Sequence, residues 1–572
     1  MCGILMVYDK KRKIEKKEIV KLRDFMIHRG PDDAGIFVDE QENIALAHRR
    51  LSILDLSAAG HQPMTIDENY IVFNGEIYNY VELAQESKIS LQSNHSDTFV
   101  LLNLLNKYKE KILNNLNGMW GFVYYDTFNK ELLISRDRFG KKPLYYYEDE
   151  NVFIVSSEIK PILYSKYYKK EINQNAVNEY LKTGLVDGLE ETFFKGIKRF
   201  PSAHYGIYDL KEKRFKIIRR YYSIEESIYE VSDNEEENIA KFKELFFDAV
   251  KIRLRSDVEV GTCLSGGLDS SSIYCVASEI SDKPIQSFSS RFKEEGYDEG
   301  YFIDKVIQKY PGKNHFVFPE YDNFEEKLRK IIYYLEEPSK AMGVYPQWHV
   351  MELASKHLKV LLDGQGGDEI LAGYDPYYVS FLADIKNPIK FFSEVLAIVD
   401  KKGVGILKFL AKGTLGRYLK GKKEFQNSYL ATKLLYDVYR DMLPALVKYE
   451  DKIGMAFSIE ARMPFLDYRL VNFVFSLENK YKIRNGWNKW ILRKAMKGIL
   501  PDEVTYRKDK KGFPTPFNKI LEKNKHLEKF IPKSVNGEWE KWRYVSLGIW
   551  KEMFFENQNG EDNENKKNIN VT

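Results

Sequence analysis

The chain has 572 residues, more than one hydrophobic core normally organises, so we expect at least two domains. Its apolar fraction of 44% and charged fraction of 30% are ordinary for a globular protein, and a net charge of +4 gives no electrostatic case for a nucleic-acid partner. Three cysteines without regular spacing, no run near the ~20 apolar residues of a membrane span, and an N-terminal apolar run that precedes the basic run together predict a cytoplasmic protein.

The first two hundred residues are rich in predicted strands. These are short apolar runs bounded by Gly, Asp and Asn: Gly3–Tyr8, Glu42–Ala47, Tyr70–Phe73, Gly121–Asp126, Leu132–Ser135 and Val152–Ser156. A helix is expected over Ser96–Tyr108. We place a first domain at residues 1–205 and a polar, acidic linker at 206–238.

Strands alternate with helices from about Ile239 onward, which predicts a parallel sheet. Expected strands are Val258–Leu264, Ile285–Ser289 and His357–Leu362, and a Ser/Gly loop joins the first of them to a helix at Ser270–Ile280. This second domain spans residues 239–555 and becomes mostly helical after Lys390. The polar tail, residues 556–572, is expected to be disordered.

Cys2 is a candidate nucleophile, because removal of Met1 would place its thiol and its α-amine on one terminal residue. The amine titrates near ~7.7–8.0 and can act as a base toward a thiol of ~8.5. This is the chemistry of an N-terminal nucleophile, which needs no separate histidine. On its own, Cys2 could equally be a chance cysteine on a buried strand.

Further short motifs accompany Cys2 in a fixed order. They are Cys2–Ile4, His28–Asp32, His48–Ile53, Asn74–Asn79 and Ser96–Thr98. Together they resemble the glutaminase domain of class II glutamine amidotransferases over residues 1–200. The resemblance implies an α+β fold, the N-terminal-nucleophile αββα sandwich, in which Cys2 attacks the side-chain amide of glutamine.

The same resemblance implies a glutamine site. Arg50 would hold the α-carboxylate, Glu76 and Asp97 would meet the α-ammonium, and the Asn74 side chain with the Gly75 N–H would form the oxyanion hole. The full implied glutamine site is Arg50, Leu51, Ser52, Ile53, Leu54, Asn74, Gly75, Glu76 and Asp97.

The segment Ser265–Ser271, SGGLDSS, follows a buried strand and opens a helix. Such a turn can place backbone N–H groups around phosphates, and Asp269 can hold Mg²⁺ against them. It lacks the Gly-Lys-Ser/Thr ending of a Walker A loop. The string resembles the pyrophosphatase loop of ATP-dependent, AMP-forming ligases.

Further segments narrow the resemblance to the asparagine synthetase family, from residue 1 to about Pro516. They are Asp363–Glu369 with Ala372–Tyr374, Glu460–Asp467, Lys489–Arg493 and Lys508–Phe513. This resemblance implies an α/β parallel-sheet ATP-pyrophosphatase domain with many helices, which adenylates a carboxylate with ATP and Mg²⁺ and receives ammonia through a tunnel from the first domain. It also favours a homodimer.

Site residues of the second domain follow from this resemblance. The ATP contacts would be Leu264, Ser265, Gly266, Gly267, Asp269, Ser270, Ser271, Ser290, Asp363 and Gly364. Asp269 and Asp368 would hold the metal, and Gln365 and Asp368 would line the acceptor pocket. Lys510 would stabilise the transition state at phosphorus, with Lys508 and Lys511 as alternatives one or two positions away.

The segment around Gly364 departs from the family pattern Ser-Gly-Glu-Gly-Ser-Asp-Glu. Gln365 replaces a glutamate and cannot take a proton or pair with a substrate ammonium, and Gly367 replaces a serine and enlarges or rearranges the pocket. The acceptor is therefore either aspartate, as in the family, or a carboxylate without an α-ammonium. A uronic-acid sugar nucleotide of surface polysaccharide assembly is such a carboxylate.

Three alternatives were weighed against this reading. A β-lactam synthetase would not need an intact Cys2, Arg50 and Asn74–Glu76, and an amidophosphoribosyltransferase or glucosamine-phosphate synthase would not carry SGGLDSS. A non-catalytic scaffold would be expected to show erosion at Cys2 or in the phosphate loop, and neither is eroded.

Overall fold

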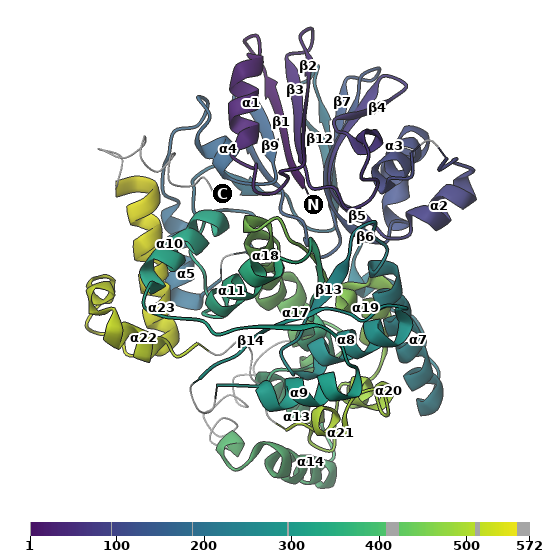
Figure 1. The fold of residues 1–572 in the computed structure, drawn as a ribbon, viewed down its shortest axis with the longest axis vertical. Helices are drawn as coiled ribbons and strands as arrows, with labels where there is room; N and C mark the ends of the chain where they lie inside the picture. Colours follow the sequence, from purple (N-terminus) through teal and green to yellow (C-terminus); the bar gives the residue numbers. More distant parts are fainter. Residues whose placement is uncertain are drawn as a thin grey trace.

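The computed structural model describes residues 2–92, 94–185, 187–293, 297–407, 423–508 and 515–556 (Figure 1). The N-terminal part, in purple and blue, stands on a larger part in teal, green and yellow. The tail predicted to be disordered lies outside the described residues, apart from Glu556.

Two antiparallel sheets form the N-terminal part. Within the described residues, one sheet has the order β10 (Lys198–Arg199), β8 (Tyr145–Glu148), β9 (Val152–Ser156), β1 (Cys2–Asp9), β3 (Ile44–Arg50) and β2 (Asp33–Asp39). The other has the order β12 (Arg214–Arg220), β11 (His204–Asp209), β7 (Glu131–Arg136), β6 (Gly118–Asp126), β5 (Asn69–Ile77) and β4 (Met64–Ile66).

Side-chain alternation in β1 explains the layering. Ile4 and Met6 point into the core between the two sheets, whereas Leu5 and Val7 point outward. The outward face packs against α1 (Lys16–Asp24) and α4 (Lys160–Leu163), and α2 (Tyr80–Ser87) and α3 (Asp97–Tyr108) cover the outer face of the second sheet. The predicted αββα sandwich is confirmed.

The sandwich extends beyond the limit predicted at residue 205. β11 pairs with β7, and β12 pairs with β11, so the stretch expected as a linker begins with two strands. Strand β12 (Arg214–Arg220) could not be predicted from hydrophobic alternation. It is an exposed edge strand with four basic residues and no buried face. The helix expected at Ser96–Tyr108 is confirmed as α3, with Ser96 as its N-cap.

A parallel sheet organises the second part, as predicted. Its order is β15 (Asn314–Val317), β14 (Ser287–Ser290), β13 (Val260–Cys263), β16 (Val360–Leu362) and β17 (Glu460–Arg462). Helices cover both faces: α7 (Glu235–Arg253) and α8 (Leu268–Ile280) on one, α10 (Phe324–Leu335), α11 (Val344–Ala354) and α18 (Met442–Ala456) on the other.

A switch in strand order determines where a site can form. Neighbours β13 and β16 are separated in sequence by β14 and β15, which lie to one side, so the chain reverses its direction across the sheet between them. The loops that leave β13 and β16 therefore diverge and open a crevice at their carboxyl ends. SGGLDSS follows β13, and Asp363–Asp368 follows β16.

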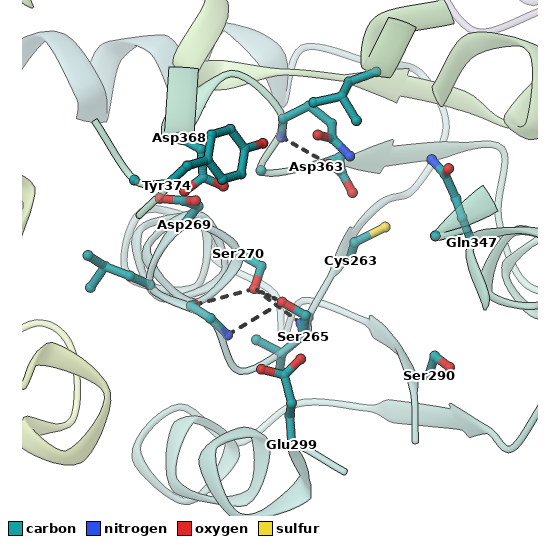
Figure 2. Close-up of a pocket in the computed structure, with 18 of the residues that line it drawn as sticks. Cys263, Ser265, Asp269, Ser270, Ser290, Glu299, Gln347, Asp363, Asp368 and Tyr374 are labelled. Atoms are coloured by element: carbon teal, nitrogen blue, oxygen red, sulfur yellow. Dashed lines mark hydrogen bonds between the residues drawn. The ribbon is translucent and has the colours of Figure 1, made fainter. Parts of the chain in front are cut away.

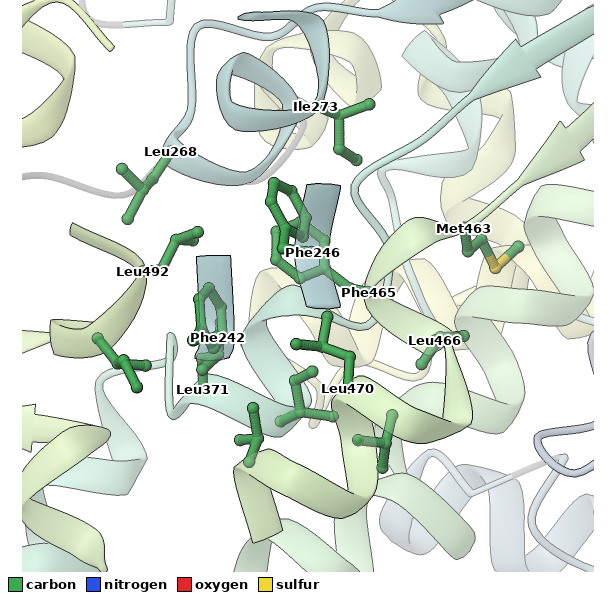
Figure 3. Close-up of a cluster of buried hydrophobic side chains, with 14 of the residues drawn as sticks. Phe242, Phe246, Leu268, Ile273, Leu371, Met463, Phe465, Leu466, Leu470 and Leu492 are labelled. Atoms are coloured by element: carbon green, nitrogen blue, oxygen red, sulfur yellow. The ribbon is translucent and has the colours of Figure 1, made fainter. Parts of the chain in front are cut away.

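The floor beneath these loops is a dense apolar cluster (Figure 3). Phe242 and Phe246 of α7 pack toward α12 (Gly367–Leu371), η3 (Pro464–Leu466) and α19 (Tyr468–Ser476), with the rings of Phe246 and Phe465 4.8 Å apart. Leu268 joins this cluster directly after the glycines of the phosphate loop. Burial of these side chains fixes the position of both loops.

Further helices complete the fold. They are α5 (Gln174–Thr183), α6 (Ile224–Ser227), α9 (Gly300–Lys309), α13 (Pro376–Asp384), α14 (Pro388–Lys402), α17 (Tyr429–Tyr439), α20 (Trp490–Ala495), α21 (Asp502–Thr505), α22 (Phe517–Lys523) and α23 (Glu538–Lys551). A small hairpin joins β18 (Ile483–Arg484) to β19 (Trp487–Asn488). No helix in the described ranges is long and apolar enough to cross a membrane.

Candidate active sites at Cys2 and at the phosphate loop

Cys2 begins the central strand β1 and pairs with Arg50 of β3. The thiol-bearing residue is 7% exposed, and its backbone N–H donates to Asn74 Oδ1 at 3.0 Å. The Asn74 amide nitrogen, expected as an oxyanion donor, faces Ser157 Oγ at 3.4 Å. Burial raises the pKa of the Cys2 thiol, whereas the Leu51 backbone N–H lowers it. A thiol that is protonated at neutral pH needs a base to become a nucleophile.

A small pocket opens beside Cys2. It is lined by most of the residues predicted for glutamine, Cys2, Arg50, Leu51, Ile53, Leu54, Gly75, Glu76 and Asp97, together with Gly60, Gln62, Phe73, Ser96 and Thr98. Ser52 and Asn74 do not line it. The Ser52 N–H donates instead to Asp32 Oδ2 at 2.8 Å.

Two glycines shape this pocket. A Cβ on Gly75 would lie 2.1 Å from the Met119 carbonyl oxygen, and one on Gly60 would lie 1.9 Å from Arg50 Nη2. Arg50 uses its guanidinium to hold the loop that follows β3, donating to the Ser57 carbonyl at 2.8 Å and to the Asp55 carbonyl. The loop and the guanidinium are thus mutually fixed at the pocket edge.

Two buried carboxyl groups, Glu76 and Asp97, face this pocket. Burial is the main cause that raises the pKa of Asp97 to about 6, although the N–H groups of Ile77 and Thr98 lower it. Burial, with the charges of Glu460 and Asp97, raises the pKa of Glu76 well above its usual value. With a pKa of about 6, Asp97 is mainly ionised at neutral pH.

The second site lies at the carboxyl ends of β13 and β16 (Figure 2). Gly266 has φ +73°, which lets the chain turn sharply after β13. The Ser265 N–H donates to Ser270 Oγ at 3.1 Å, and the Gly267 N–H faces Ser265 Oγ at 3.4 Å. The loop is closed by its own serines in front of the N-terminus of α8, where phosphate oxygens are favoured.

A cavity of about 510 Å³ extends from this loop. Of the residues predicted for ATP, metal and acceptor, it is lined by Leu264, Ser265, Gly267, Asp269, Ser270, Ser290, Asp363, Gly364, Gln365 and Asp368. Gly266 and Ser271 do not line it. The Gly266 carbonyl accepts from Arg507 at 3.1 Å, and Ser271 is fully buried in α8.

Asp269 and Asp368 converge at the phosphate end of the cavity (Figure 2). Lys489 Nζ bridges them, binding Asp269 and lying 2.6 Å from Asp368 Oδ1. Asp269 Oδ1 is buried without a hydrogen-bond partner in the described structure. Two adjacent carboxylates with a spare oxygen suit Mg²⁺, which takes one or two carboxylates and completes its shell with phosphates and water.

Gly367 has a structural reason to differ from serine. A Cβ at this position would lie 2.7 Å from Asp269 Cγ and 2.8 Å from its Oδ1. The predicted effect of Gly367 is thus a rearrangement, in which the Asp269 carboxyl occupies the space next to the glycine. Gln365 lies two residues before Gly367, and its N–H donates to Asp363 Oδ1 at 3.0 Å.

Buried ion pairs join the two sites. Arg29 donates through Nε to the Cys2 carbonyl at 2.9 Å and through Nη2 to Asp451 Oδ2 at 2.8 Å. Arg462 of β17 lies 3.5 Å from Glu76 Oε1 and 2.6 Å from Glu460 Oε1, and its carbonyl accepts from the Asp363 N–H at 2.9 Å. One residue therefore touches the pocket at Cys2 and the loop that lines the larger cavity.

Several residues of these sites were not assigned a role from the sequence. Lys489 and Arg462 belong to motifs quoted above, but only their positions in the fold show what they contact. Gln347 of α11 lines the cavity and had no motif to mark it. Lys510 and Lys511 lie outside the described residues, and Lys508 is exposed beside the cavity.

Comparison with known proteins gives two matching families. The family described as Asparagine synthase matches residues 241–572, and the Glutamine amidotransferase domain matches residues 1–222. A protein of Methanocaldococcus jannaschii named "Putative asparagine synthetase (glutamine-hydrolyzing) 2" is 34% identical over 490 residues, covering 80% of this chain and 94% of that protein. Asparagine synthetase (glutamine-hydrolyzing) 1 of Bacillus subtilis is 30% identical over 582 residues, covering 93% of this chain and 90% of that protein.

Proposed function

The chain belongs to the asparagine synthase family and is a glutamine-dependent carbon–nitrogen ligase, and on that premise we propose that it amidates a carboxylate in two coupled steps. Cys2 releases ammonia from glutamine. The second domain adenylates the acceptor with ATP, releasing pyrophosphate, and ammonia then displaces AMP. The acceptor is aspartate by family.

One observation carries this proposal: a chain of buried contacts connects the nucleophile pocket to the phosphate-loop cavity. Arg29 and Asp451 connect the backbone of Cys2 to α18, whose residues Met442, Leu446 and Tyr449 line the cavity. Two sites that acted independently on separate substrates would not require such a buried connection.

Glutamine fits the Cys2 pocket by its charges. Arg50 would hold the α-carboxylate, and Asp97, charged at neutral pH, would hold the α-ammonium, which directs the side-chain amide toward Cys2. The α-amine of Cys2, exposed by removal of Met1, would act as the base for the buried thiol. Asn74 and the Gly75 N–H would receive the oxyanion.

ATP fits the second cavity through the phosphate loop. The N–H groups and serines of Ser265–Ser270 would bind pyrophosphate, and Leu264 and Ser290 would border the nucleoside. Mg²⁺, when bound by Asp269 and Asp368, would offset the charge of the phosphates. Lys489 bridges these two carboxylates, offsetting one of their two negative charges, and would release one of them to the metal.

Ammonia needs a dry passage between the sites, because in water at neutral pH it becomes non-nucleophilic ammonium. Arg29, Asp451 and Arg462, which lie between the two sites, are fully or almost fully buried, and this supports a passage that excludes water. The predicted homodimer and cytoplasmic location remain predictions.

A second acceptor class is favoured by Gln365. The described residues at the α18 side of the cavity include the neutral amides of Gln347 and Gln365, which can accept and donate hydrogen bonds without charge. An acceptor without an α-ammonium, such as a uronic-acid sugar, would suit this surface.

AMP and pyrophosphate release from ATP, Mg²⁺ and glutamine tests the proposal, with aspartate compared against a panel of sugar acids. Release with aspartate, together with asparagine, would make the enzyme an asparagine synthetase. Release with a sugar acid alone would keep the mechanism and change the acceptor. Glutamine hydrolysis without AMP release for any carboxylate would refute the proposal.

A further inference from the structure

Glu450 is a buried carboxyl that the proposed reaction does not use. It lies on α18 directly behind the cavity wall and is 0% exposed. Its Oε2 accepts a hydrogen bond from Gln347 Nε2, and its Oε1 has no hydrogen-bond partner in the described part of the chain. Burying a carboxyl costs folding free energy unless neighbouring groups form hydrogen bonds with it.

Both glutamines next to Glu450 line the cavity. Gln347 is bound to Glu450 directly, and the Gln365 side chain lies near enough to Glu450 to lower the pKa of this carboxyl. Burial and the charge of Asp363 act in the opposite direction and raise the pKa of Glu450 well above its usual value. Glu450 does not line the cavity itself; it is connected to the cavity by its hydrogen bond with Gln347, and Gln365 lies nearby.

The position of Glu450 relates this side of the cavity to Cys2. The next residue, Asp451, accepts from Arg29, and Arg29 donates to the Cys2 carbonyl. Successive residues of a helix point about 100° apart, so α18 presents Asp451 to the nucleophile domain and Glu450 to the cavity. Ammonia that comes from Cys2 along this wall would reach the cavity beside the two glutamines.

We propose that Glu450 is the positioning carboxyl of the acceptor end of this cavity. It holds the amide of Gln347, next to that of Gln365, so that the amide oxygens face the adenylated acceptor and the arriving ammonia. When a carboxyl accepts a hydrogen bond from the NH₂ group of a glutamine side chain, the amide oxygen of that glutamine points away from the carboxyl. Such oxygens can accept N–H groups of the incoming nucleophile. This inference rests on the proposed function, of which it specifies the acceptor site.

The same geometry explains why position 365 carries an amide. A glutamate there would add a third carboxyl group next to the buried Glu450 and Asp363. Like charges at such distances disfavour each other. One acid and one amide therefore occupy positions 450 and 365. Exchanging the two side chains should impair acceptor binding less than changing either one alone.

A swap series tests the pairing. Glu450→Gln, Gln365→Glu and the double variant are compared with the wild type and with Glu478→Gln, which makes the same chemical change at an exposed site. We expect each single change to raise the KM for the acceptor roughly 10- to 100-fold, the size of a lost hydrogen bond to a charged group, with a smaller effect on the KM for ATP. The double variant should have a lower acceptor KM than either single variant.

Gln347→Met provides a second route if Glu450→Gln does not fold. It removes the hydrogen bond from the other side, and it should raise the acceptor KM by a similar factor. An acceptor KM unchanged in Gln347→Met and in Glu450→Gln, or a double variant worse than both single variants, would overturn the inference while the wild type still releases AMP. A wild type that releases no AMP with any carboxylate would overturn the proposed function itself.

Discussion

At the scale of single residues, the pocket at Cys2 contains two buried carboxyl groups, Glu76 and Asp97. Glu76 and Asp97 lie within one buried network with Glu460 and Arg462, and desolvation raises the pKa of both pocket carboxyls. A pKa of about 6 leaves Asp97 mainly ionised at neutral pH. Its charge, held by the N–H groups of Ile77 and Thr98, is what a bound α-ammonium would meet.

The KM for glutamine should therefore rise as the pH falls through about 6, because Asp97 then takes up a proton and loses its charge. Well below that pH the rise should be roughly tenfold per pH unit. The glutaminase reaction, measured from pH 5 to 8, checks this. Asp97→Asn should have a high KM for glutamine at every pH, and a wild-type KM that does not change between pH 7 and 5 would contradict the assignment.

The same shift has a stability consequence. The folded pKa of Asp97 lies above the ordinary value of 3.8, so the folded state binds this proton more tightly than the unfolded chain. Asp97 therefore adds stability as the pH falls from about 6 toward 4, and this contribution is lost as the pH rises again.

At the scale of elements, the positions of the loops at the phosphate site are fixed by the helices that pack against them. α12 begins at Gly367, directly against the Asp269 carboxyl of α8. That contact holds two elements far apart in sequence at a fixed distance, and it places Asp269 next to Lys489 and Asp368.

Gly367→Ser should push the Asp269 carboxyl away from Lys489, because the new Cβ would lie 2.8 Å from its oxygen. Losing one charged contact in the phosphate site should raise the KM for Mg-ATP roughly tenfold. Gly405→Ala is the matched control, since its Cβ would meet nothing within 4 Å. An equal KM for Mg-ATP in the two variants would show that Asp269 does not need its present position.

Elements with a buried face could be predicted from the sequence, and those without one could not. β1 and α3 carry continuous apolar positions and clear boundaries, whereas β12 has a basic, exposed sequence and forms only because β11 offers it an edge. Contacts at the sites divide in the same way. Motifs predicted Cys2 and the SGGLDSS loop, but the contacts of Gln347, Glu450 and Arg462 depend on tertiary packing that local patterns do not encode.

At the scale of the whole molecule, the two parts are held together by buried charges. Arg462 is fully buried, pairs with Glu460, approaches Glu76, and donates to the carbonyls of Arg253 and Arg255 at 2.8 and 2.7 Å. Each partner is buried away from water, so removing any one of them would leave another buried charge without its counter-ion.

Arg462→Ala should destabilise the protein by about 3–5 kcal/mol, because it leaves the Glu460 charge buried without a cation. The midpoint of denaturant unfolding of the full chain measures this. Arg214→Ala, at a side chain 73% exposed, should change stability by less than ~0.5 kcal/mol. Similar midpoints for the two variants would contradict a structural role for the buried network.

Transfer of nitrogen from glutamine to the product tests the central claim most directly. The enzyme is given ATP, Mg²⁺, glutamine labelled with ¹⁵N at its amide, the carboxylate that supports AMP release, and an excess of unlabelled ammonium. The account predicts a product amide that carries ¹⁵N, because ammonia passes inside the protein from Cys2 to the adenylate, and an unlabelled product from Cys2→Ala. A wild-type product as unlabelled as the surrounding ammonium would contradict it.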